Sequence, residues 1–108
     1  MDDLHAKFLP QFVVLARSRV AMAVKAVGER DHNATAKIVR ELHTLAGEAG
    51  LLGLQDVVPL ARDSEDKAKA LHRTRADADA EVLISTLSQL DHVIESIGAT
   101  SSATRKDS

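Results

Sequence analysis

The chain has no cysteine, tryptophan or tyrosine, and each absence removes a class of functional site. Without cysteine there is no disulfide, no thiolate zinc site and no cysteine nucleophile. The only aromatic residues are Phe8 and Phe12, so platforms for stacking nucleic-acid bases are lacking. No apolar run approaches the roughly 20 residues that span a bilayer. These absences favour a cytoplasmic protein that acts on neither membranes nor nucleic acid.

The charged residues are nearly balanced in number. Fourteen Lys and Arg stand against sixteen Asp and Glu, which gives a formal net charge of −2, and no long basic block occurs. Binding to DNA or RNA depends on clustered positive charge that neutralises phosphates. The balance therefore also argues against a nucleic-acid partner. At 108 residues the chain is expected to form one domain, and we expect a monomer.

Apolar residues recur at alternating steps of three and four in three segments, and the N-terminal stretch from about Leu4 to Val27 is richer in apolar residues available for burial, which together predict four amphipathic helices. No segment alternates apolar and polar residues as a strand does. The apolar stripes are, in chain order, Phe8, Phe12, Leu15, Val20, Val24 and Val27; Ile38, Leu42, Leu45, Ala49 and Leu52; Leu54, Val57, Ala61, Ser64, Ala68 and Leu71; and Leu83, Leu87, Leu90, Ile94 and Ile97. Short connections favour antiparallel neighbours, so the predicted fold is all-α, an antiparallel up-down-up-down four-helix bundle.

Local signals mark the breaks between the first three helices. Gly28 and the polar residues after it are expected to close the first helix, with Asp31 or Asn33 as the N-cap of the second. Gly50 and Gly53 are expected to end the second helix and turn the chain tightly into the third.

The two ends of the chain carry their own signals. Pro10 predicts a short N-terminal turn or a kink in the first helix. After Gly98 the sequence is polar and low in complexity, so we expect a helical domain over residues 1–98 and a flexible tail over 99–108. Met1 and this tail favour a complete small protein over an excised domain.

His43 lies in the second predicted helix and points away from its apolar stripe. At about 100° per residue it falls about 140° from the centre of the stripe, on the solvent side. The residues on the same side are mostly small: Ala36, Val39, Arg40, Ala46, Gly47 and Gly50. Glycine inside a helix costs about 1 kcal/mol relative to alanine, so two glycines here invite an explanation. An exposed imidazole on a low, apolar surface predicts chemistry with a visiting protein.

The segment from His43 to Gly53 resembles the signature of histidine-containing phosphotransfer (HPt) domains. In that family a phosphorylatable histidine is followed by Leu at +2, usually Lys at +3, Gly at +4, a small residue at +6 and Gly at +10. This chain has His43, Leu45, Gly47, Ala49 and Gly53 at the matching positions. The resemblance covers about residues 4 to 97, and it implies an HPt-like bundle that carries a phosphoryl group on His43 and is not itself an enzyme.

One position departs from the family pattern. Ala46 stands at +3, where the usual lysine is thought to help hold the phosphoryl group. Arg40, one turn earlier and about 60° around the helix, is the best substitute in the sequence, and Gln55 and Arg62 are weaker candidates. By the resemblance, the surface that binds phosphate and partner comprises Ala36, Val39, Arg40, Ala46, Gly47, Gly50 and Gln55.

The chemistry suits histidine, whose ordinary pKa of about 6.5 leaves a neutral, nucleophilic imidazole near physiological pH. Phosphoryl transfer asks chiefly for positioning and charge stabilisation. The resemblance implies two kinds of partner, a response-regulator receiver domain and a sensor or hybrid histidine kinase. The receiver would bring Mg²⁺, a lysine and the acceptor aspartate, so no cofactor is expected on this chain. His5, His32, His72 and His92 show no i, i+4 spacing for a metal.

Two other functions stay open at this stage. The first is an HPt-like adaptor that binds receiver domains or kinases without carrying phosphate, for which Ala46 is the main argument. The second is a helical enzyme with His43 as general base. Glu48 lies on the opposite side of the helix from His43, and the sequence shows no convergent nucleophile, acid or metal site.

Overall fold

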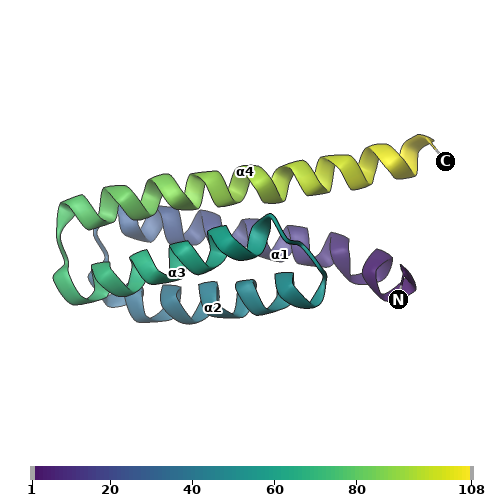
Figure 1. Ribbon diagram of the computed structural model, residues 1–108. Helices are drawn as coiled ribbons and strands as arrows, with labels where there is room; N and C mark the ends of the chain where they lie inside the picture. Colours follow the sequence, from purple (N-terminus) through teal and green to yellow (C-terminus); the bar gives the residue numbers. More distant parts are fainter. Residues whose placement is uncertain (1, 108) are drawn as a thin grey trace.

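The computed structural model describes the backbone of residues 2–107 and the side chains of residues 7–99. Four helices follow one another: α1 (Asp2–Gly28), α2 (Thr35–Leu51), α3 (Val57–Thr74) and α4 (Asp77–Asp107). A short 3₁₀ turn, η1 (His32–Ala34), precedes α2. Consecutive helices run in opposite directions, and both chain termini lie at the same end of the bundle (Figure 1). The predicted up-down-up-down bundle is confirmed, and residues 2–107 contain no strand.

The core consists of the apolar stripes that the periodicity predicts. In α2 to α4 nearly every stripe residue is buried, including the one serine, Ser64. The buried apolar residues are Leu9, Phe12, Ala16, Val20, Ala23, Val27, Ile38, Leu42, Leu45, Ala46, Ala49, Val57, Ala61, Ala68, Leu71, Ala80, Leu83, Leu87, Leu90 and Ile94. Within the described part of the chain, no helix combines the length and the apolar character that crossing a membrane requires.

Two residues of the first stripe were predicted to be buried but are exposed to solvent. Phe8 is 40% exposed and Leu15 is 53% exposed. The reason is that α1 packs closely on α4, whereas its packing against α2 is much sparser. The side of α1 that faces α2 therefore keeps apolar side chains in contact with solvent.

Gly50 and Gly53 terminate the second helix, as predicted, because they take part in a Schellman motif that follows Leu51. The N–H of Leu54 donates to the carbonyl of Ala49 over 2.9 Å, and the N–H of Gly53 donates to that of Gly50 over 3.1 Å. Gly53 has a φ of +71°, in the left-handed region that glycine adopts without a Cβ clash. This turn fixes how α3 folds back against α2, and so which of their residues meet.

The connection from α1 to α2 begins after Gly28, as predicted, but the predicted N-cap of α2 is wrong: that position is Ala34, which makes no side-chain cap. Asp31 instead caps the turn η1, which intervenes before α2, by accepting from the N–H of Asn33. Here the left-handed position is taken by Arg30, with a φ of +57°. Its guanidinium bonds to Glu81 and Asp77 at the start of α4, and these hydrogen bonds raise the pKa of Arg30. The Arg30 side chain thereby links the connection between α1 and α2 to the start of α4.

The ends of the chain differ from the expectation in two ways. Helix α1 is continuous through Pro10, so there is no separate first turn. Helix α4 does not stop at Gly98 but continues to Asp107. Gly98 allows a close approach between helices, because an added Cβ would lie 3.0 Å from a methyl carbon of Val13. Side chains from residue 100 onward lie outside the described residues, and the flexible tail over 99–108 stays a prediction.

Candidate functional site

His43 lies near the middle of α2 with its side chain directed outward, as predicted. The side chain is 74% exposed, whereas Leu42 and Leu45 beside it are buried in the core. One ring nitrogen, Nδ1, is 3.1 Å from Oε2 of Glu65 on α3. Glu65 is only 8% exposed, so it contacts the edge of the imidazole that faces the protein, while the opposite edge of the ring faces solvent.

The partner of Nδ1 determines which ring nitrogen is reactive. An ionised carboxylate can only accept a hydrogen bond, so Nδ1 carries the proton that bonds to Glu65. A neutral imidazole has one N–H, which leaves Nε2 with its lone pair free. Nε2 is therefore the ring nitrogen with a free lone pair, and the 74% exposure of the side chain leaves it accessible from solvent.

A lysine completes the group on α3. Nζ of Lys69 lies 3.4 Å from Oε2 of Glu65, the same oxygen that contacts His43. The spacing of Glu65 and Lys69 is i, i+4, which places them on one face of the helix. The site thus contains an imidazole, a carboxylate and an ammonium group in sequence across the seam between α2 and α3.

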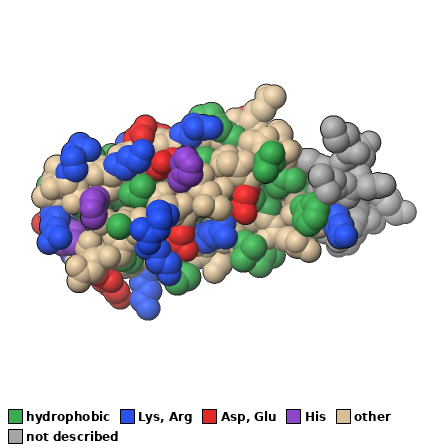
Figure 2. Space-filling model, turned by 90° about the horizontal axis from the view of Figure 1, so that it is seen from below, with side chains coloured by type: hydrophobic (Ala, Val, Ile, Leu, Met, Phe, Trp, Pro, Cys, Tyr) green, Lys and Arg blue, Asp and Glu red, His purple; other side chains and the backbone are tan. Residues whose placement is uncertain are grey.

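A second contact fixes the register of this seam. Oγ1 of Thr35, at the start of α2, lies 2.6 Å from Nδ1 of His72, in the last turn of α3. Because the helices are antiparallel, residues of α2 and α3 whose numbers add to about the same value lie opposite each other. Figure 2 shows the face of the bundle that α2 and α3 form, where histidine side chains lie among basic and acidic ones.

Four of the predicted surface residues are accessible to solvent on α2, and their role in binding stays a prediction. Gly47 and Gly50 are exposed, and Ala36 and Val39 are half-buried. A Cβ added at Gly47 or Gly50 would meet no atom within 4 Å among the described residues. The packing of this chain therefore gives no reason for either glycine, and the open space lies on the side of the imidazole.

Two of the predicted residues do not belong to the exposed site. Ala46 is 2% exposed, because α3 packs over that side of α2. Gln55 lies in the turn beyond the end of α2, which continues for eight residues, or about 12 Å, past His43. Ala46 is thus a core residue, and the structure does not bring Gln55 to His43.

Arg40 is exposed but faces a different neighbour. It lines a cleft of about 290 Å³ between α1 and α2, together with Arg19, Lys37, Glu41 and Thr44. This cleft lies on the α1 side of α2, whereas Glu65 approaches His43 from the α3 side. Glu48 bonds to Arg19 over 3.1 Å and is not a partner of His43, as predicted.

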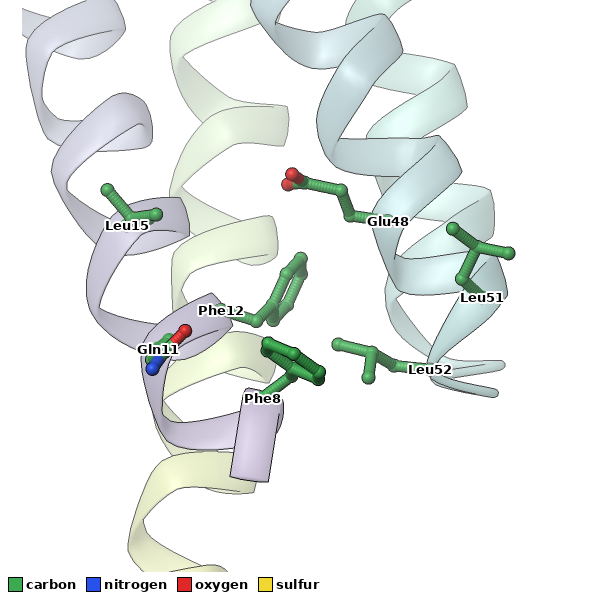
Figure 3. Close-up of a pocket in the computed structure, with 7 residues that line it drawn as sticks. All are labelled: Phe8, Gln11, Phe12, Leu15, Glu48, Leu51 and Leu52. Atoms are coloured by element: carbon green, nitrogen blue, oxygen red, sulfur yellow. The ribbon is translucent and has the colours of Figure 1, made fainter. Parts of the chain in front are cut away.

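Beyond Glu48, an apolar pocket of about 350 Å³ continues the seam between α1 and α2. In Figure 3, Phe8 and Phe12 of α1 and Leu52, just after the end of α2, point toward one another at its base, with Leu15 and Leu51 at opposite rims. Leu51 is 91% exposed. In Figure 2, apolar side chains gather toward this end of the molecule, next to the residues drawn in grey.

Glu65 and Lys69 are the residues of the candidate site that sequence reasoning missed. The tight turn around Gly53 and Leu54 offered a signal, because in an antiparallel helix pair residues equally far from the turn lie opposite each other. His43 and Glu65 are both eleven positions from Leu54. A carboxylate opposite the histidine could have been located in this way.

Comparison with known proteins gives one finding. The model of the Hpt domain family matches residues 7–100, which is most of the chain and includes His43, Glu65 and Lys69. No match was found among curated proteins or among solved structures.

Proposed function

The chain belongs to the Hpt domain family, whose members are phosphoryl carriers in two-component phosphorelays, and on this premise we propose that His43 is its phosphorylated residue. In this proposal His43 accepts a phosphoryl group from the aspartate of a receiver domain, or passes one to it. A sensor or hybrid histidine kinase stands further along the same relay. The observation that carries the proposal is the exposed imidazole whose Nδ1 bonds to Glu65, which leaves Nε2 free.

In the transfer step the Nε2 lone pair attacks the phosphorus of the partner's aspartyl phosphate. The N–P bond forms as the P–O bond to the aspartate breaks, and the bonding electrons leave with the carboxylate oxygen. The imidazole ring thereby gains positive charge while its proton stays on Nδ1. The Glu65 carboxylate, 3.1 Å from Nδ1, stabilises that charge. The reverse step returns the phosphoryl group to an aspartate.

The surface around His43 suits the approach of a folded partner. In-line transfer requires the acceptor aspartate to come close to Nε2, so bulky side chains nearby would obstruct it. Gly47 and Gly50 leave that space open. By family analogy the receiver supplies Mg²⁺, and the expectation that this chain needs no cofactor of its own stays a prediction.

We further propose that the same receiver rests on the apolar pocket between α1 and α2. The pocket rim at Leu51 belongs to the helix that carries His43, two turns further on. A partner centred on His43 would therefore cover it. Burial of Phe8, Leu15 and Leu51 would add apolar contact area to an otherwise polar site.

The test is incubation of the purified chain with a receiver phosphorylated on its aspartate. The expected result is an acid-labile, alkali-stable adduct on wild type and none on His43→Gln. The matched control is His92→Gln, because His92 is also an exposed histidine on a helix, at 84%, and this variant should be labelled normally. A wild-type chain that is never labelled, or a His43→Gln variant that labels equally, would refute the proposal.

Ala46 favours one second candidate, an adaptor that binds receivers without carrying phosphate. The residue at +3 from the histidine lacks a charge, and its side chain is buried. In that case the wild-type chain would bind the receiver with measurable affinity but would stay unlabelled. The labelling experiment, combined with a binding titration, separates the two functions.

A further inference from the structure

The charge beside His43 comes from a different helix than the sequence pattern suggests. We propose that Lys69 on α3 is the cation that stabilises the phosphoryl group on His43, in place of the lysine that Ala46 replaces. This inference rests on the proposed function of His43. It assigns the phosphate-binding role to a residue 26 positions after the histidine in sequence.

The geometry places Lys69 within reach of the phosphoryl group. Its Nζ lies 3.4 Å from Oε2 of Glu65, and the same oxygen lies 3.1 Å from Nδ1 of His43. The ammonium group is thus two polar contacts away from the imidazole. The Lys69 side chain is 52% exposed, so it has the freedom to turn toward a group bound at Nε2.

The charges of the site require such a cation. A phosphoryl group brings up to two negative charges next to the Glu65 carboxylate, which is itself largely buried. The negative charges of the phosphoryl group and of the Glu65 carboxylate repel each other across the imidazole ring, and a nearby ammonium group offsets this repulsion. Lys69 already neutralises Glu65 in the free protein, and it stands where it can contact both anions in the phosphorylated one.

The other cations near the site are placed less well. Arg40 lines the cleft on the α1 side of α2, away from Glu65. Arg62 lies one turn before Glu65 on α3 and is exposed, and it has no ion pair with any of the described residues. Within the described side chains, Lys69 is the one lysine or arginine that contacts the carboxylate bound to His43.

The experiment measures the charge around the phosphoryl group directly. The full chain is phosphorylated with phosphoramidate, whose phosphorus is attacked by Nε2 while the amide nitrogen leaves as ammonia. A ³¹P NMR titration then gives the pKa of the phosphoryl group on His43. In Lys69→Gln this pKa should rise by about 0.7 pH units, the effect of one charge about 4 Å away at the dielectric constant of water. Lys69→Arg should restore the wild-type value.

Lys67→Gln is the matched control, because it removes a lysine from the same helix that instead bonds to Asp63 and Thr86. Its titration should coincide with that of wild type. The proposal is overturned if Lys69→Gln titrates like wild type, if Lys67→Gln shifts equally, or if Arg40→Gln shifts the pKa and Lys69→Gln does not. In each of these outcomes, labelling of wild-type His43 by phosphoramidate would still support the proposed function. If His43 is not labelled at all, both the proposed function and the role of Lys69 are refuted.

Discussion

His43 and Glu65 are joined by a hydrogen bond of 3.1 Å between Nδ1 and Oε2 that links α2 to α3. The histidine side chain is 74% exposed and the glutamate side chain is 10% exposed. A buried carboxylate thus orients an exposed imidazole, which fixes the proton on the inner nitrogen and leaves the outer one free. The pair gives the site both its accessible nucleophile and its tautomer.

Glu65→Gln should slow phosphoryl transfer to His43 by about tenfold, since a hydrogen bond to a charged group contributes about 1.5–3 kcal/mol and each 1.4 kcal/mol is a factor of ten. The amide can still accept from Nδ1 but lacks the charge that stabilises the ring during attack. Glu65→Ala, which removes the acceptor as well, should be slower still. Single-turnover transfer from a phosphorylated receiver measures both rates.

Glu81→Gln serves as the control for these variants, because Glu81 is a carboxylate on α4 that bonds to Arg30 instead. Its transfer rate should equal that of wild type. Nitrogen-15 NMR of the imidazole gives an independent readout, in which wild type should show the proton on Nδ1. Equal rates in Glu65→Ala and wild type would mean that the hydrogen bond has no part in the reaction.

The sequence predicted the helices, the core of α2 to α4 and the exposure of His43, because all of these follow from the angular spacing of residues within one helix. The Schellman turn at Gly53 could also be predicted, because it depends only on the residues next to that glycine in the sequence. Even the family assignment depended on residues within one helix and the turn that follows it.

The features that could not be predicted from the sequence depend on how the helices pack against one another. Ala46 is about 60° from His43 around the helix and was expected on the exposed surface, but α3 covers that side. Glu65 and Lys69 were missed because their role comes from the register of α3 against α2. Phe8 and Leu15 were expected in the core, yet α1 packs only sparsely against α2, and these two residues line the pocket between the helices.

Gly47 tests whether the space beside His43 serves a partner. Gly47→Ala should increase the free energy of unfolding by about 1 kcal/mol, since alanine is the better helix former and its Cβ would meet no neighbour within 4 Å. Transfer should be retained in this variant. Gly47→Leu should fold equally well but should lose transfer, because the larger side chain stands in the path of the acceptor aspartate.

Urea denaturation and single-turnover transfer, measured on both Gly47 variants, separate the two effects. A folded Gly47→Leu protein that transfers at the wild-type rate would show that the open space has no function. A Gly47→Ala protein that is less stable than wild type would instead point to a packing role for the glycine.

The apolar pocket between α1 and α2 predicts where a receiver is bound. Leu51→Gln should weaken receiver binding by about tenfold, because the substitution replaces an apolar side chain that the receiver would bury with a polar one. Stability should change little, because Leu51 is 91% exposed in the free protein. Isothermal titration calorimetry with the receiver gives the dissociation constant.

Val82→Gln is the matched control for the pocket, since Val82 is an exposed apolar residue, at 46%, on α4. It should bind the receiver with wild-type affinity. If Leu51→Gln binds as tightly as Val82→Gln, the receiver does not cover this pocket, whatever the state of His43.

Ser64 offers a prediction about stability alone. Its side chain is fully buried in α3, and its Oγ has no hydrogen-bond partner among the described residues. A buried hydroxyl without a partner costs about 1–3 kcal/mol, so Ser64→Ala should increase the free energy of unfolding by about 1 kcal/mol in urea denaturation. Thr86→Val is the contrasting variant, because the Thr86 hydroxyl donates to the carbonyl of Val82 and accepts from Lys67. It should lower the stability, and a Ser64→Ala protein that loses stability as well would show that the Ser64 hydroxyl is bonded in solution.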